Sequence, residues 1–164
     1  MAYAAISKPG LHFNTKLYSG NGSTQNITGV GFQPDFIWQK ERTSTSYHVI
    51  TDAVRGNTKQ LFTNVSAAEA TDSNYITSFD SDGFGQGQND DTNQSGQTYV
   101  AWNWKAAGTS GSANNDGSIA TTVAANTTAG FSIVKWTGTG SAGTLGHGLG
   151  AVPHAIWVKK TSQS

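Results

Sequence analysis

One stretch of this chain occurs twice, and the repetition limits the folds open to it. Residues 13–40 (FNTKLYSGNGSTQNITGVGFQPDFIWQK) recur as residues 131–159 (FSIVKWTGTGSAGTLGHGLGAVPHAIWVK), with one residue inserted. The identical pairs are Phe13/Phe131, Gly20/Gly138, Gly22/Gly140, Ser23/Ser141, Gly29/Gly148, Gly31/Gly150, Pro34/Pro153, Ile37/Ile156, Trp38/Trp157 and Lys40/Lys159. They are turn glycines, a proline and apolar strand positions. Internal repetition of this kind is typical of a modular array.

The apolar pattern predicts strands rather than helices. Phe13, Thr15 and Leu17 alternate with polar or amphipathic residues, as in a half-buried strand. Further short strands are expected around 27–30, 36–38, 47–51, 61–62, 75–79, 99–105 and 119–123, with Gly-rich turns between several of them. Only residues 64–71 could form a helical turn, and it is too short to be stable alone. This spacing predicts an all-β fold, an antiparallel β-sandwich or jelly roll.

The repeat also predicts how the chain is divided. We expect an N-terminal arm at residues 1–12, a first β-sandwich repeat at 13–107, a Gly/Ser/Asn linker at 108–118 and the start of a second repeat at 119–164. The strands of the second copy carry the same apolar positions as those of the first, so they need a partner sheet. We expect them to dock on the first repeat or on a neighbouring subunit, because unpaired aromatic strands invite aggregation.

Aromatic residues on the predicted strands are the expected core. In residues 99–105, Val100, Trp102 and Trp104 share one face and alternate with Tyr99 and its neighbours. The face with the two tryptophans is expected to be buried between two sheets. The full set of expected core residues is Phe36, Trp38, Trp102, Trp104, Trp136 and Trp157.

Composition excludes several classes of partner. Ten Lys and Arg balance ten Asp and Glu, and charged residues make up 12% of the chain, about half the usual share. Zero net charge gives no argument for a nucleic-acid partner. The sequence has no cysteine, so disulfides and thiolate metal sites are excluded. No apolar run reaches the roughly 18 residues of a membrane span, so membrane insertion is not expected.

No catalytic motif stands out, and a non-enzymatic protein is expected. The four histidines, His12, His48, His147 and His154, do not lie at metal-ligand spacing. A pair of carboxylates for glycoside hydrolysis could come from Asp80, Asp82, Asp90 and Asp91. Those residues fall in a predicted turn and a predicted exposed loop, where carboxylates are normally only solvated.

Calcium is the one metal with sequence support. The stretch Asp80-Ser81-Asp82-Gly83 matches the start of an EF-hand loop and offers hard oxygen ligands. The later acidic ligand and the flanking helices are absent, which favours a plain Asp-Gly turn. We therefore expect no cofactor, with a calcium site at Asp80 and Asp82 as the weaker alternative.

Residues 85–97 (GQGQNDDTNQSGQ) are the predicted ligand surface. They contain no apolar residue and are expected to form a long polar loop presented by rigid strands. The residues most suited to contact a ligand are Asn89, Asp90, Asp91, Asn93 and Tyr99. Tryptophans could also serve as platforms for sugars, but their strand positions favour a core role.

Several ordered motifs carry a family resemblance. The repeated stretch, together with DAVRG, TSFDSDGF and YVAWNWKAAG, resembles a repeat domain of tail-fibre and other structural proteins of marine tailed phages. The resemblance covers about residues 12–159 and implies a concanavalin-like sandwich located in the virion. It supplies no catalytic residues.

The resemblance leads to an expected function. The chain is expected to be a virion structural module, in a tail fibre or similar host-contacting appendage. Its expected partners are other virion proteins and copies of itself, with a trimer expected by analogy to fibres. The apolar N-terminal residues MAYAAI are expected to support this self-association. Two alternatives stay open: a lectin-like module for host surface glycans, and a capsid-decorating protein.

Overall fold

The computed structural model of the chain describes residue 6 and residues 8–162. Of the predicted N-terminal arm, residues 1–5 and 7 lie outside the described residues, and so does most of the MAYAAI stretch. The first described element is a single 3-10 turn, η1 (Pro9–Leu11), in which proline begins the turn. Within residues 8–162, no helix is long and apolar enough to cross a membrane.

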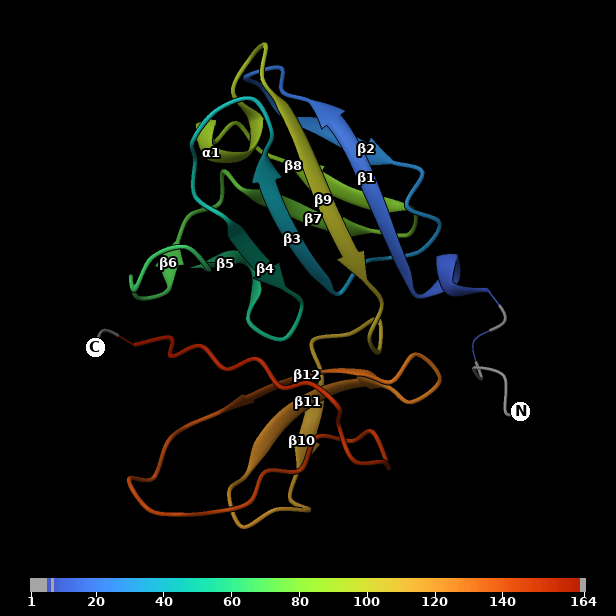
Figure 1. Cartoon of the computed structure of the whole chain (residues 1–164), viewed down its shortest axis with the longest axis vertical. Helices are drawn as coiled ribbons and strands as arrows, with labels where there is room; N and C mark the ends of the chain where they lie inside the picture. Colours follow the sequence, from blue (N-terminus) through green and yellow to red (C-terminus); the bar gives the residue numbers. More distant parts are fainter. Residues whose placement is uncertain (1–5, 7, 163–164) are drawn as a thin grey trace.

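The largest element of the fold is a six-stranded antiparallel sheet (Figure 1). Its order is β1 (Phe13–Ser19), β9 (Thr98–Trp104), β3 (Phe36–Glu41), β4 (Val49–Asp52), β5 (Gly56–Phe62) and β6 (Ala70–Thr71). Strand β9 is central, because it pairs with β1 on one side and with β3 on the other. Residues from both ends of the predicted first repeat are therefore held together in one sheet.

A second, three-stranded sheet closes the sandwich. It has the order β2 (Gln25–Thr28), β8 (Gly83–Gln86) and β7 (Ile76–Asp80). The core between the two sheets contains Ile27, Ile37, Ile76, Phe84 and Ala101. These residues come from strands of both sheets, so the chain is all-β with an antiparallel β-sandwich, as the sequence predicted.

The predicted core face of β9 is the wrong one. Strand β9 alternates as expected, but Tyr99, Ala101 and Asn103 face the core and are fully buried. Trp102 and Trp104 lie on the outer face and are only half-buried, although Val100 on the same face is buried. The inner face combines the large Tyr99 with the small Ala101, so side-chain size alone does not identify the buried face.

The same correction applies to β3 and to the second copy. Phe36 and Trp38 are half-buried on the outer face of β3, while Ile37 between them is fully buried. Trp136 and Trp157 are 37% and 69% exposed, so neither is a core residue. Alternation gave the two faces of each strand, but the face that points inward was inferred wrongly from side-chain size.

The second copy of the repeat is joined to a third sheet. This sheet has the order β10 (Ser112–Asn114), β11 (Thr121–Asn126) and β12 (Phe131–Trp136), and lies below the sandwich in Figure 1. Strand β10 falls inside the predicted linker 108–118, where it pairs with β11. The sequence of β10, Ser-Ala-Asn, has no large apolar residue that would indicate a strand. Its strand conformation therefore depends on pairing with β11.

The two copies resemble each other more in their turns than in their strands. Strand β12 is the counterpart of β1, but the counterpart of β2 makes one bridge, Ile119–Leu145. The counterpart of β3, residues 155–160, forms no strand. The repeated turn glycines keep left-handed backbones: Gly22/Gly140 (φ 69°/75°), Gly29/Gly148 (80°/70°) and Gly31/Gly150 (88°/69°). Local turn chemistry survives in the second copy, whereas β3 depends on the partners β4 and β9.

Residues 64–71 do not form the predicted helical turn. They are irregular until β6, and the described part of the chain has its one α-helical turn at α1 (Asp90–Asn93) instead. The Asn89 side chain caps that turn by accepting a hydrogen bond from the Asp91 amide at 3.0 Å. The helix therefore starts at an Asn cap that the polar composition of residues 85–97 concealed.

Candidate functional site

The residues predicted to bind a ligand do gather around α1, but they mainly bind one another. The Asn89 Nδ2 donates to the Asp72 carboxylate at 3.1 Å. The Tyr75 hydroxyl donates to Asp91 at 2.6 Å, and burial together with this carboxylate raises the pKa of Tyr75. Asp90 is exposed, but it lies in a cluster whose other polar groups already have partners. The cluster therefore closes one end of the sandwich.

Asn93 and Tyr99 are fully buried, which corrects their assignment as ligand contacts. The Asn93 amide donates to the carbonyls of Ser23 (2.6 Å) and Gly87 (2.7 Å), and its oxygen accepts from Gln25 (2.7 Å). The Tyr99 hydroxyl accepts from the Gln94 amide at 2.9 Å, and burial raises the pKa of Tyr99 to about 12. Both side chains anchor the 85–97 segment, which is not a free surface loop.

Asp82 stabilises a turn by accepting hydrogen bonds from its backbone. Its two carboxylate oxygens accept hydrogen bonds from the Gly29 amide (3.0 Å) and the Gly31 amide (2.6 Å). These bonds hold the pKa of Asp82 below its usual range. Among residues 8–162 there is no cluster of three His, Cys, Asp or Glu side chains that could hold a metal ion, and both carboxylate oxygens of Asp82 are engaged by backbone amides.

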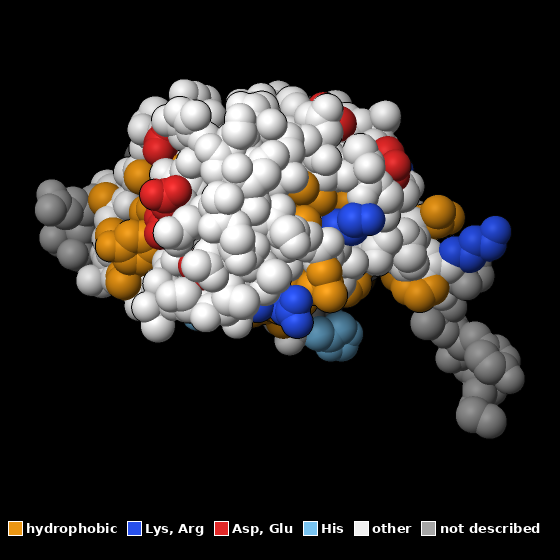
Figure 2. Space-filling view, turned by 90° about the horizontal axis from the view of Figure 1, so that it is seen from above, with side chains coloured by type: hydrophobic (Ala, Val, Ile, Leu, Met, Phe, Trp, Pro, Cys, Tyr) orange, Lys and Arg blue, Asp and Glu red, His pale blue; other side chains and the backbone are white. Residues whose placement is uncertain are grey.

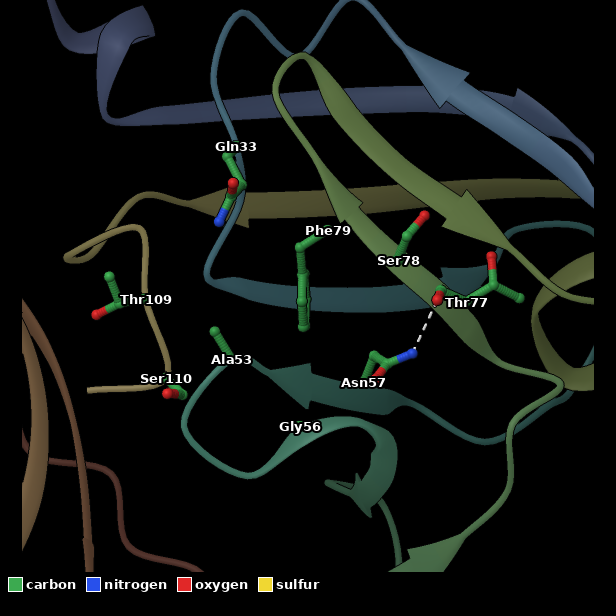
Figure 3. A pocket seen from close by; sticks show the side chains of 9 residues that line it. All are labelled: Gln33, Ala53, Gly56, Asn57, Thr77, Ser78, Phe79, Thr109 and Ser110. Carbon is green, nitrogen blue, oxygen red and sulfur yellow. Dashed lines mark hydrogen bonds between the residues drawn. The ribbon is translucent and has the colours of Figure 1, made fainter. Parts of the chain in front are cut away.

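A hollow of about 350 Å³ lies where the β4–β5 connection, the edge strand β7 and the start of the linker meet (Figure 3). One wall is the turn between β4 and β5, and another is the edge strand β7. The third wall is the start of the linker. The residues lining the hollow are Gln33, Ala53, Gly56, Asn57, Thr77, Ser78, Phe79, Thr109 and Ser110.

The lining combines one aromatic ring with uncharged polar groups. Phe79 is half-buried, with its inner side packed on the sandwich core. The Asn57 Nδ2 donates to the backbone carbonyls of Ile76 (3.2 Å) and Thr77 (2.9 Å), which ties the start of β5 to β7. None of the nine lining residues has a charged side chain, so the lining holds no carboxylate, imidazole or amine that could act as a catalytic acid or base.

Asp35 positions the linker wall of the hollow. Its carboxylate accepts hydrogen bonds from the amides of Ala106 (2.6 Å) and Gly108 (3.0 Å), directly before Thr109. Asp35 is fully buried, and burial raises its pKa above the usual range. The Gln33 side chain adds a bond to the Gly108 carbonyl at 3.3 Å. The linker therefore leaves the sandwich in a defined direction.

An aromatic surface on the outer face of the six-stranded sheet is the second feature. The Trp38 and Trp102 rings lie 5.3 Å apart, and Trp104 lies 4.8 Å from Phe13. Phe131 of β12 stacks on Trp104 at 6.0 Å, and Trp157 meets Trp38 edge-on at 5.8 Å. Residues from the second copy therefore cover part of this outer face.

The hollow was hard to predict from the sequence. Phe79 appeared only as a strand residue, and Asn57 only as a turn residue. Thr109 and Ser110 fell in a segment interpreted as a flexible linker. The available signal was the uncharged Thr-Ser pair beside glycines, but it acquires meaning only once Asp35 fixes the linker against the sandwich.

Comparisons with known proteins give one match. The family model described as Domain of unknown function (DUF7483) matches residues 8–164. No curated protein and no solved structure matches the chain.

Proposed function

This chain belongs to the DUF7483 family, and we propose that it is a non-enzymatic structural module of a tailed-phage virion. Its place would be a tail fibre or a similar host-contacting appendage, where it would bind copies of itself and other virion proteins. The proposal combines the resemblance of the repeated motifs to phage structural proteins with the way the two copies pack.

The packing of one repeat on the next carries the proposal. A small cluster of Val54, Ala106 and Ala124 is buried between the sandwich and the third sheet, with Phe131 and Ile133 packed against it. The Asn126 side chain adds a hydrogen bond to the Lys105 carbonyl at 3.3 Å. A module that offers its outer sheet face to the next repeat suits an array built by repetition.

The C-terminal segment supports an assembly role. It runs back beside the six-stranded sheet (Figure 1), where the Glu69 amide donates to the Thr161 carbonyl at 2.9 Å. Lys159 donates to the Val65 carbonyl at 2.8 Å. Val152, Ile156 and Val158 are nevertheless 85%, 73% and 69% exposed, so apolar surface is left for a neighbouring module.

The surface chemistry agrees with a particle component. Figure 2 shows a face that is mostly backbone and side chains that are neither hydrophobic nor charged, with several hydrophobic patches and scattered acidic and basic side chains. The chain as a whole has zero net charge. Such a surface has no strong field of one sign, which suits close packing among many copies.

Labelling of virus particles tests the proposal. An antibody raised against the purified chain should decorate the tail appendages of particles that encode it, as seen by electron microscopy. The purified chain should also form a defined oligomer by light scattering. Labelling confined to infected-cell lysate, with no signal on purified particles, would contradict the virion assignment.

A further inference from the structure

We propose that the hollow lined by Phe79, Asn57 and the first linker residues binds a neutral saccharide. The proposal does not depend on the virion assignment, because the hollow is built from the sandwich and its linker alone. Its volume of about 350 Å³ is within the range of roughly 300–1,000 Å³ that is common for small-molecule sites.

The aromatic ring supplies the apolar contact that a sugar ring needs. Phe79 projects into the hollow between the β4–β5 turn and Gln33 (Figure 3). Its packing on the core fixes the ring, so little conformational entropy is lost when a ligand stacks on it. Ala53 is the only other apolar side chain in the lining, so a largely apolar ligand would leave many polar groups unpaired.

The polar groups match a polyhydroxylated ligand. Asn57 uses its Nδ2 on the β7 carbonyls, and no hydrogen bond within the described residues engages its Oδ1. The Ser110 hydroxyl can donate and accept, as sugar hydroxyls do, whereas the Thr77 and Ser78 hydroxyls lie beside Gly85 of β8 and leave only their own backbone to this wall. Neutral amides and hydroxyls around one aromatic ring are the chemistry that recognises a neutral pyranose.

Charge selects against acidic sugars. The lining contains no Lys or Arg to pair with a carboxylate or sulfate. Asp35 lies behind the linker wall, where one of its carboxylate oxygens, Oδ2, accepts hydrogen bonds from the Ala106 and Gly108 amides. An anionic saccharide would gain no partner here and would lose hydration, so the site should prefer neutral chains.

The test is an NMR titration of the full chain with maltotriose, cellotriose and chitotriose, with trigalacturonic acid as the acidic comparison. At least one neutral trisaccharide should shift the amide signals of Phe79, Ser110 and the Asn57 side chain. Trigalacturonic acid should bind at least ~10-fold more weakly, a difference of about 1.4 kcal/mol. No shift with any of the three neutral probes would overturn the proposal, as would equal binding of the acidic one.

Two variants locate the site without disturbing the core. Ser110→Trp fills the hollow from the exposed linker and should reduce the affinity at least ~10-fold. Thr45→Trp is the matched control, because Thr45 is exposed in the loop after β3, at the other end of the sandwich. Equal loss in both variants, or unchanged binding in Ser110→Trp, would overturn the assignment to this hollow. Virion labelling is a separate measurement, so failure of either proposal can be recognised.

Discussion

At the scale of single residues, the carboxylates of Asp35 and Asp82 should make the stability of the fold depend measurably on pH. Burial raises the pKa of Asp35, so the unfolded chain loses this proton at a lower pH than the folded chain. The Asp35 contribution to stability therefore falls as pH rises from its ordinary pKa, about 3.9, through the folded value. In Asp35→Asn this decline should be absent, which urea unfolding across an acidic pH series would measure. Parallel curves for the variant and the parent would contradict the prediction.

Asp82 should behave in the opposite sense. Hydrogen bonds from Gly31 and Gly29 lower its pKa, so its contribution is present above the unfolded pKa and is lost as pH falls through the folded value. Asp82→Asn should therefore be less stable than the parent near neutral pH, and the difference in stability should disappear in acid.

Added Ca²⁺ should leave the melting temperature of the parent unchanged. A rise in that temperature with Ca²⁺ would restore the metal site considered for Asp80 and Asp82.

At the scale of elements, the strand phase can be tested with two truncations. Ile37 is fully buried between the sheets, so Ile37→Ala should cost about 2–5 kcal/mol of unfolding free energy. Trp102 is half-buried on the outer face. Trp102→Ala should therefore lower the unfolding free energy by less than Ile37→Ala does, although it removes a larger side chain. Chemical denaturation of both variants gives the comparison. A larger loss of unfolding free energy for Trp102→Ala would indicate that the tryptophan face of β9 forms the core.

Strand alternation was predictable from the sequence, but the inward face was not. Period-two patterns placed β1, β3, β7 and β9 close to their observed positions. Both faces of β9 are largely apolar, and Tyr99 and Trp102 each look suitable for a core. The choice depends on the distance between sheets and on what covers the outer face. Those are tertiary quantities that one strand does not encode.

The burial of polar side chains could not be predicted from the sequence either. Gln86 is fully buried, where its amide bonds to the Tyr75 carbonyl (2.9 Å) and Thr92 (2.9 Å) and accepts from Gln39 (2.6 Å). A run of Gly, Gln, Asn and Asp normally indicates a solvated loop. Here the backbone closes around these side chains and satisfies them, so residues that resemble a binding loop hold one end of the sandwich together.

At the scale of the whole molecule, the repeat predicted two related units but not their unequal structures. Gly20 shows the reason. A Cβ added there would lie 2.1 Å from the Gln94 carbonyl oxygen, so only glycine fits beside α1. Its counterpart Gly138 has nothing within 4 Å. The same sequence signal therefore marks close packing in one copy and open space in the other.

The last prediction concerns the contact between the two copies. Phe131 lies 5.8 Å from Phe36 and 6.0 Å from Trp104, so Phe131→Ala should uncover both rings. Because Phe131 is half-buried, the loss should be near or below the lower end of the ~3–5 kcal/mol range for buried Phe→Ala changes. Tryptophan emission should shift to longer wavelength as Trp104 becomes hydrated. Lys135→Ala, exposed on the same strand, is the control and should change neither quantity. If Phe131→Ala kept the parent melting temperature and emission, the two copies would be energetically independent, and an array built by packing one repeat on the next would lose its physical basis.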